Sequence, residues 1–195
     1  MRIAIALFDG AEELDFAGPW EVLAYWARDV ADAEVQVVTV AASLDPIRAA
    51  NGMRVLPDRT WDNVGAIDVL VVPGGQGTRR LLGPDEPLHD RLRALARGGT
   101  LMTSVCTGSL VYAAAGLLRA RPATTHFRAL DLLASLDPSI EVRPDDRYVD
   151  DGDIVTAAGV SAGIDMALYL VLRLDSPDAA RRVKREIQYD PQPPV

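Results

Sequence analysis

Short apolar runs of strand length alternate with helix-length segments along most of this chain, and this alternation limits its fold more than any other feature. The runs 2–7 and 68–72 are mostly apolar and the run 100–105 is half apolar, without a regular alternation of polar and apolar side chains. Strands of this kind are buried on both faces and occur in parallel sheets that helices cover. The sequence therefore predicts an α/β fold, a three-layer sandwich with a mostly parallel central sheet and helices on both faces.

Turn and capping residues indicate the remaining elements. Helices are expected over residues 19–28, 86–97, 107–117, 126–135, 161–174 and 177–188, with further strands over 34–40 and an extended pair near 147–156. Pro19 and Pro177 suit the first position of a helix, and Ser161 and Ser176 suit the N-cap. Asn51-Gly52 predicts a hairpin turn between two short extended stretches.

Length and charge restrict the class of protein. A chain of 195 residues, about half of them apolar, suits one compact domain over residues 1–195. Its 28 acidic and 20 basic residues give a net charge of −8, which disfavours nucleic acid as a partner because phosphate backbones are repelled. The basic stretch 181–185 is interpreted as the solvated face of the last helix, with Val183 and Ile187 facing inward.

The sequence also restricts the location of the protein. No apolar run approaches the ~18 residues of a membrane span, and the N-terminal apolar run is too short for a signal peptide. A single cysteine cannot form an internal disulfide. A soluble, cytoplasmic protein without a membrane partner is therefore expected. We expect His89 at the surface, and the tail 191–195 either disordered or extended along a neighbouring chain.

Three segments that carry reactive or flexible residues follow three of the expected strands. They are residues 9–15, residues 74–77 and the turn at Cys106. Open parallel sheets place their sites beyond the carboxyl ends of the strands. The sequence therefore predicts that these segments converge on one edge of the sheet and bind a small-molecule substrate there.

The segment Ser104-Val105-Cys106-Thr107-Gly108 has the pattern of a nucleophile elbow, with small residues two before and two after the nucleophile. The unpaired amides and the dipole at the start of the next helix should favour a thiolate at Cys106. The same amides, with that of Gly108 among them, would be available to an oxyanion. The alternative is that Cys106 is a small buried apolar residue, the commonest role of a lone cysteine.

The segment Pro73-Gly74-Gly75-Gln76-Gly77 does not fit a dinucleotide-binding fingerprint. Its glycines would let the backbone approach a substrate, so that the amides of Gly74, Gly75 and Gln76 point at developing negative charge. The alternative is a simple turn without a binding role.

Asp15 places a carboxyl among apolar neighbours. Burial and a nearby thiolate would raise the pKa of Asp15 and make it a proton donor; the alternative is that it only satisfies local backbone N–H groups. Glu12 and Glu13 are competitors that we interpret as solvated. His126 either lines the pocket or caps the helix after it. Two separated histidines and one cysteine have no metal-ligand spacing, so no metal site is expected.

Three motifs resemble the ThiJ/PfpI family of the class I glutamine-amidotransferase-like superfamily: Pro73-Gly74-Gly75, Ser104-Val105-Cys106-Thr107-Gly108-Ser109 and Gly159-Val160-Ser161-Ala162-Gly163-Ile164-Asp165. The resemblance covers essentially the whole chain and implies a flavodoxin-like sandwich and a homodimer. It carries over Cys106 as the nucleophile, Asp15 as its acidic partner and Thr107 as the residue after the nucleophile. Many members have histidine where this chain has Thr107, which weakens a hydrolytic Cys–His interpretation.

Further motifs are similar to the branch of this family that hydrates isonitriles: Leu14-Asp15-Phe16-Ala17-Gly18-Pro19, Cys106-Thr107-Gly108-Ser109-Leu110 and Ala123-Thr124-Thr125-His126. This resemblance implies hydration of an isonitrile to the N-substituted formamide through a covalent thioimidate, without a cofactor. The alternatives within the family are a glyoxalase or deglycase that acts on reactive carbonyls, and a non-enzymatic sensor of a ligand or of oxidative stress.

Overall fold

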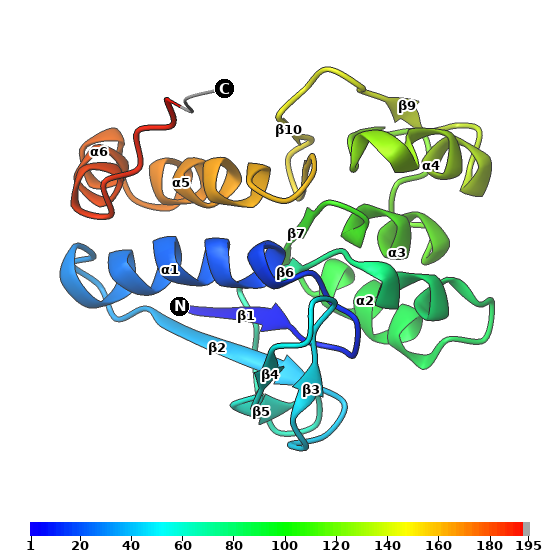
Figure 1. The fold of residues 1–195 in the computed structure, drawn as a ribbon, viewed down its shortest axis with the longest axis horizontal. Coiled ribbons are helices and arrows are strands. Elements are labelled where there is room, and N and C mark those ends of the chain that lie inside the picture. Colours follow the sequence, from blue (N-terminus) through cyan, green and yellow to red (C-terminus); the bar gives the residue numbers. More distant parts are fainter. Residues whose placement is uncertain (193–195) are drawn as a thin grey trace.

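A seven-stranded sheet forms the centre of the computed structural model, which describes residues 1–192 (Figure 1). The order across the sheet is β10-β11-β7-β6-β1-β2-β5. Within the described residues β10 is antiparallel to β11, and the other neighbouring strands are parallel. The strands are β1 (Arg2–Ala6), β2 (Gln36–Ala41), β5 (Arg59–Thr60), β6 (Val69–Val72), β7 (Leu101–Val105), β10 (Tyr148–Asp150) and β11 (Ile154–Ala157). The predicted α/β fold with a mostly parallel sheet is confirmed.

Helices cover both faces of the sheet, as Figure 1 shows. One face carries α1 (Glu13–Asp29), α5 (Ala162–Leu174) and α6 (Pro177–Glu186). The other carries α2 (Pro87–Arg97), α3 (Gly108–Ala114) and α4 (Leu130–Leu136). The structure is therefore the predicted three-layer sandwich.

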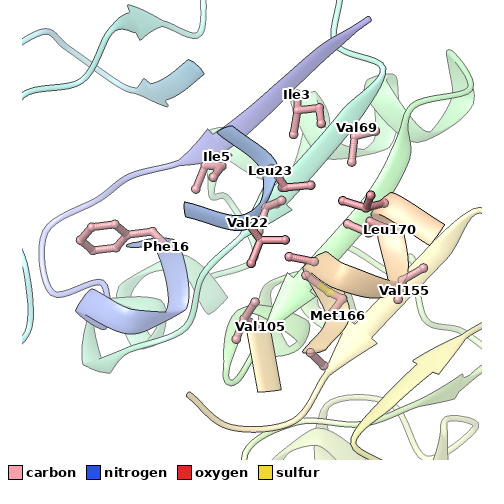
Figure 2. Close-up of a cluster of buried hydrophobic side chains, with 14 of the residues drawn as sticks. Ile3, Ile5, Phe16, Val22, Leu23, Val69, Val105, Val155, Met166 and Leu170 are labelled. Atoms are coloured by element: carbon pink, nitrogen blue, oxygen red, sulfur yellow. The ribbon is translucent and has the colours of Figure 1, made fainter. Parts of the chain in front are cut away.

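The sheet separates two hydrophobic cores. Figure 2 shows the core beneath α1 and α5, where Ile5 of the sheet lies near Leu23 of α1 and Val105 of the sheet lies near Met166 of α5. Successive strand residues point to opposite faces, so that Val71 belongs to this core and Leu70 to the other. This double burial is the physical reason for the apolar runs in the sequence.

Two pairs of short strands and two 3₁₀ helices lie outside the main sheet. Gly52 turns the antiparallel pair β3 (Ile47–Arg48) and β4 (Arg54–Val55) with a φ of +103°, so the hairpin predicted at Asn51-Gly52 is confirmed. The other elements are β8 (Pro122–Ala123), parallel to β9 (Glu141–Val142), and the 3₁₀ helices η1 (Gln76–Leu82) and η2 (Phe127–Ala129).

The first helix begins earlier than predicted. α1 starts at Glu13, so Pro19 lies inside the helix and does not open it. A proline there removes one backbone hydrogen bond. The Pro19 ring packs closely against α5, where a Cβ added at Gly163 would lie 3.2 Å from it. The earlier start places Asp15 in the first turn of α1, with its backbone fixed by the helix.

Two other predictions about single residues are wrong. His89 is only 2% exposed, because it shares the inner side of α2 with Leu92, and its Nε2 lies 2.8 Å from the carbonyl oxygen of Leu81. Ser161 precedes α5 but does not cap it: its Oγ accepts a hydrogen bond from Arg147 at 2.9 Å.

The predictions for the last helix are confirmed. Ser176 caps α6 by accepting the N–H of Ala179 at 3.1 Å, and Pro177 is its first residue. Val183 is buried and Ile187 packs against the same core, while the basic side chains of α6 are exposed. Of the predicted extended tail, residues 193–195 lie outside the described residues.

Candidate active site

Cys106 stands at a sharp turn between β7 and α3. Its φ angle is +56°, which residues other than glycine rarely adopt. Its N–H donates to the carbonyls of Ala157 and Ala158 at 3.1 and 2.9 Å, and its carbonyl accepts from the Thr125 hydroxyl at 2.9 Å. A strained backbone of this kind costs about 1–3 kcal/mol and persists only where surrounding contacts enforce it. The predicted strand-to-helix turn is therefore present, and its neighbours hold it in place.

Small residues flank this turn for steric reasons. Ser104 is fully buried, and a Cβ at Gly108 would lie 2.2 Å from the carbonyl oxygen of Val72. Only glycine lets α3 begin directly against the end of β6. Gly108 was expected to bind substrate, but the structure gives it a packing role: it is not among the residues that line the cleft beside Cys106.

Asp15 lies buried beside the cysteine. Its Oδ2 accepts the backbone N–H of Gly74 at 2.9 Å, and its side chain has no exposed surface. Its Oδ1 is also buried and has no hydrogen-bond partner with standard geometry among the described residues. An unpaired buried carboxyl oxygen is costly, and here it is the atom free to interact with the thiol or with a substrate.

Asp15 and Cys106 each shift the pKa of the other. Burial raises the pKa of Asp15 to about 7, and the charge of Glu12 adds a smaller increase. Hydrogen bonds from the backbone amide of Gly74 and from the Cys106 thiol act in the opposite direction and lower this pKa. Burial, followed by the charge of Asp15, raises the pKa of the Cys106 thiol to about 12. Hydrogen bonds from the backbone amides of Thr107 and Val160 act in the opposite direction and lower this pKa. Beside an ionised carboxylate the sulfur is therefore a thiol, whereas the helix start alone predicted a thiolate. An ionised Asp15 repels a thiolate at Cys106, and protonation of Asp15 removes this repulsion. The carboxylate of Asp15 is therefore a suitable acceptor for the proton that the sulfur loses.

Thr107 links the turn to the glycine-rich loop after β6. The N–H of Gly75 donates to Thr107 Oγ1 at 2.9 Å, and the Thr78 hydroxyl lies 3.2 Å from the same atom while donating to the Gly75 carbonyl at 2.7 Å. The Thr107 side chain thus fixes the loop against the cysteine.

The glycines of this loop serve close packing. Gly75 has a φ of +115°, and a Cβ there would lie 2.3 Å from the carbonyl oxygen of Gly10. The amide of Gly74 is occupied by Asp15 and that of Gly75 by Thr107. The prediction that these two amides point at a substrate is therefore wrong, because protein oxygens already accept their hydrogen bonds.

A cleft of about 550 Å³ opens beside the sulfur. Cys106 is 6% exposed and lines it. Its lining residues are Glu12, Gly75, Gln76, Arg79, Cys106, Thr107, His126, Arg128 and Val160. The three segments predicted to converge at the carboxyl edge of the sheet do meet here, with Asp15 buried behind the cleft wall.

His126 does both of the things that its sequence context suggested. Its ring lines the cleft, and its Nδ1 accepts the N–H of Arg128 at 3.2 Å, which caps η2. Burial and then the charge of Arg128 lower the pKa of His126 below its usual value. The imidazole is therefore neutral at neutral pH.

Sequence reasoning missed Arg79, Arg128 and Val160 as lining residues. An arginine in a polar segment carries no signal that separates a cleft wall from open surface. Val160 has a φ of +48°, which is unusual for a β-branched residue and directs its backbone amide to the sulfur. That conformation depends on the packing of the segment before α5 and has no local sequence signature.

Residues 1–192 contain neither a metal-binding cluster nor a membrane-spanning helix. No three His, Cys, Asp or Glu side chains are grouped so that they could bind a metal ion. None of the helices in this part of the chain combines the length and the apolar character needed to cross a membrane.

The fold and the site define a flavodoxin-like α/β protein with a cysteine and a buried carboxyl at the carboxyl edge of its sheet. The chain belongs to the DJ-1/PfpI family, whose model matches residues 1–173. It is 40% identical over 194 residues to the isonitrile hydratase of Pseudomonas putida. The match covers 100% of this chain and 81% of that protein. The family resemblance inferred from the motifs is confirmed.

Solved structures agree with this assignment. A ThiJ/PfpI family protein from Pseudomonas syringae matches with a TM-score of 0.87 and 31% identity, covering 100% of this chain and 77% of that chain. DJ-1beta of Drosophila melanogaster matches with a TM-score of 0.85 and 22% identity over 97% of this chain and 98% of that chain, which supports the fold alone.

Proposed function

We propose that this chain hydrates isonitriles, R–N≡C, to N-substituted formamides, with Cys106 as the nucleophile and no cofactor. The observation that carries the proposal is the pairing of a cleft-lining thiol with the buried carboxyl of Asp15, whose pKa of about 7 suits proton transfer at neutral pH. The 40% identity to the isonitrile hydratase of Pseudomonas putida supports the choice of reaction.

In the first step the sulfur of Cys106 attacks the terminal carbon of the isonitrile. A carbon–sulfur bond forms, and the thiol proton passes to the ionised carboxylate of Asp15. The carboxylic acid then gives this proton to the same carbon, which yields the thioimidate R–N=CH–S–Cys106. A group whose pKa lies near the working pH can both accept and donate the proton.

In the second step water adds across the C=N bond, with hydroxyl on carbon and hydrogen on nitrogen. The adduct R–NH–CH(OH)–S–Cys106 then loses its carbon–sulfur bond and releases R–NH–CHO. The hydroxyl proton returns to the sulfur, so the thiol is restored. The amides of Thr107 and Val160 interact with the sulfur and are the nearest candidates to stabilise charge on the adduct, in place of Gly74 and Gly75.

We expect the wild type to convert an aryl isonitrile to its formamide and Cys106→Ala to lose about 10³-fold or more in kcat, because no thioimidate can form. Formamide absorbance measures the rate, and mass spectrometry of wild type mixed with substrate tests for the covalent adduct. Circular dichroism of the variant checks that it is folded. No turnover of any isonitrile by the wild type would remove this proposal.

The same preparations separate the alternative functions. Lactate formation from methylglyoxal would favour the reactive-carbonyl activity, and absence of turnover with either substrate would favour a sensor. We also propose a cytoplasmic homodimer, on the resemblance to the family. Light scattering of the purified chain measures its mass, and a monomer at micromolar concentration would contradict this assembly.

A further inference from the structure

We propose that the cleft beside Cys106 selects isonitriles that carry a carboxylate, with Arg79 and Arg128 as the specificity-determining residues. This inference rests on the proposed function, since it names the substrate class of the same site. Both arginines line the cleft together with the cysteine. They come from different elements, Arg79 from η1 and Arg128 from η2.

Neither arginine is neutralised by the protein. Within residues 1–192 the ion pairs involve other arginines, and Arg79 and Arg128 take part in none of them. Glu12 is the one acidic residue among the lining residues, and its Oε1 accepts a hydrogen bond from Asn51 Nδ2 at 3.1 Å. With a neutral His126, the cleft wall carries two positive charges and one negative charge.

This local balance is opposite in sign to that of the whole chain, whose net charge is −8. Fields of one sign inside a cleft raise the local concentration of ligands of the opposite charge. A neutral isonitrile would gain little from two guanidinium groups, whereas a carboxylate matches their planar donor geometry in a bidentate pair.

Of the two arginines, Arg128 is the one whose guanidinium contacts an aromatic ring among the described residues. Its backbone N–H is bonded to His126, and its guanidinium lies over the ring of Phe127 at 5.3 Å from the centroid. A guanidinium stacked on an aromatic ring loses less side-chain freedom when it binds. We therefore assign the main carboxylate contact to Arg128 and a supporting one to Arg79.

The substrate that fits this arrangement has an isonitrile at the sulfur and a carboxylate at the arginines. Its hydration product is an N-formyl amino carboxylate, with the carboxylate unchanged by the reaction. 4-Isocyanobenzoate and its methyl ester form a matched pair of probes, because they share the ring and the isonitrile and differ in charge.

We expect the wild type to have a higher kcat/KM for 4-isocyanobenzoate than for the ester, with the preference falling as salt is added. Arg128→Gln should lower kcat/KM for the carboxylate by about 10- to 100-fold, mainly through KM, and change that for the ester less than about 2-fold. Arg79→Gln should act in the same direction and more weakly. Arg80→Gln is the matched control, because Arg80 is an exposed neighbour that does not line the cleft.

Binding of 4-formamidobenzoate, measured by calorimetry, separates failure of this inference from failure of the proposed function. Turnover of both probes without a preference for the carboxylate, or equal losses in Arg128→Gln and Arg80→Gln, would overturn the inference and leave the hydratase proposal intact. Binding that Arg128→Gln abolishes, without turnover of either probe, would support the anion site and remove the hydratase proposal.

Discussion

At the scale of single residues, the chemistry of this site depends on a carboxyl and a thiol that share a buried environment. Burial raises the pKa of Asp15 to about 7 and that of Cys106 to about 12. The first value lies in the range where a side chain both accepts and donates protons at neutral pH. Asp15 is therefore the group whose titration should control both activity and stability.

We expect the stability of the wild type, relative to Asp15→Asn, to fall as the pH rises from about 4 to about 7. The pKa of Asp15 is raised from 3.8 to about 7, so across this window the folded chain retains a proton that the unfolded chain has released. Stability then decreases by at most about 1.4 kcal/mol per pH unit. Denaturant unfolding of both proteins across this range measures the effect.

The contrary result is a stability difference between the two proteins that does not vary with pH. It would mean that Asp15 titrates normally in the folded chain and that its environment is more hydrated than the structure indicates. The kcat of Asp15→Asn gives a second readout, since asparagine can keep the hydrogen bond to Gly74 but cannot relay the proton.

At the scale of elements, the position of the sulfur depends on how α3 meets the end of β6. The contact is between backbones, because a Cβ at Gly108 would lie 2.2 Å from the carbonyl oxygen of Val72. A backbone carbonyl in a central strand cannot move without disturbing its ladder. The turn at Cys106 is therefore sensitive to a single added methyl group.

Gly108→Ala should destabilise the fold by about 1–3 kcal/mol, as overpacking in a tight core does, and should lower isonitrile turnover by displacing the sulfur. Gly83→Ala is the matched control: nothing lies within 4 Å of its added Cβ, and its φ of −63° suits alanine. Thermal unfolding and the formamide assay measure both effects. Equal stability of the two variants would show that α3 can shift away from β6.

At the scale of the whole molecule, one sheet separates two cores, and no buried side chain of residues 1–192 belongs to both. Ile5 of β1 faces the core under α1 and α5, and Ile154 of β11 faces the core under α3 and α4. Strands β7 and β6 lie between β11 and β1, so at ~4.8 Å per strand the two residues are about 14 Å apart. The two cores should therefore respond independently to small changes.

Ile5→Val and Ile154→Val should each destabilise the chain by about 0.5–1.5 kcal/mol, and the double variant by their sum within about 0.5 kcal/mol. All three should unfold in one cooperative transition, because both cores share the same sheet. Denaturant unfolding followed by fluorescence and by circular dichroism tests this. Two separate transitions would contradict a common folding unit.

Local sequence patterns predicted the layered fold, the hairpin at Asn51-Gly52 and the turn at Cys106. Buried strands require apolar runs, the positive φ angle of the hairpin requires a residue such as glycine, and the turn at Cys106 requires small flanking residues. The burial of His89, the start of α1 and the occupied amides of Gly74 and Gly75 were decided by tertiary structure alone. Each of these depends on which groups from distant segments arrive at the same place, such as Asp15 at an amide 59 residues away. For the same physical reason, the sequence did not predict that Arg79 and Arg128 line the cleft. The two arginines come together in the cleft wall only when η1 and η2 are folded beside the sulfur.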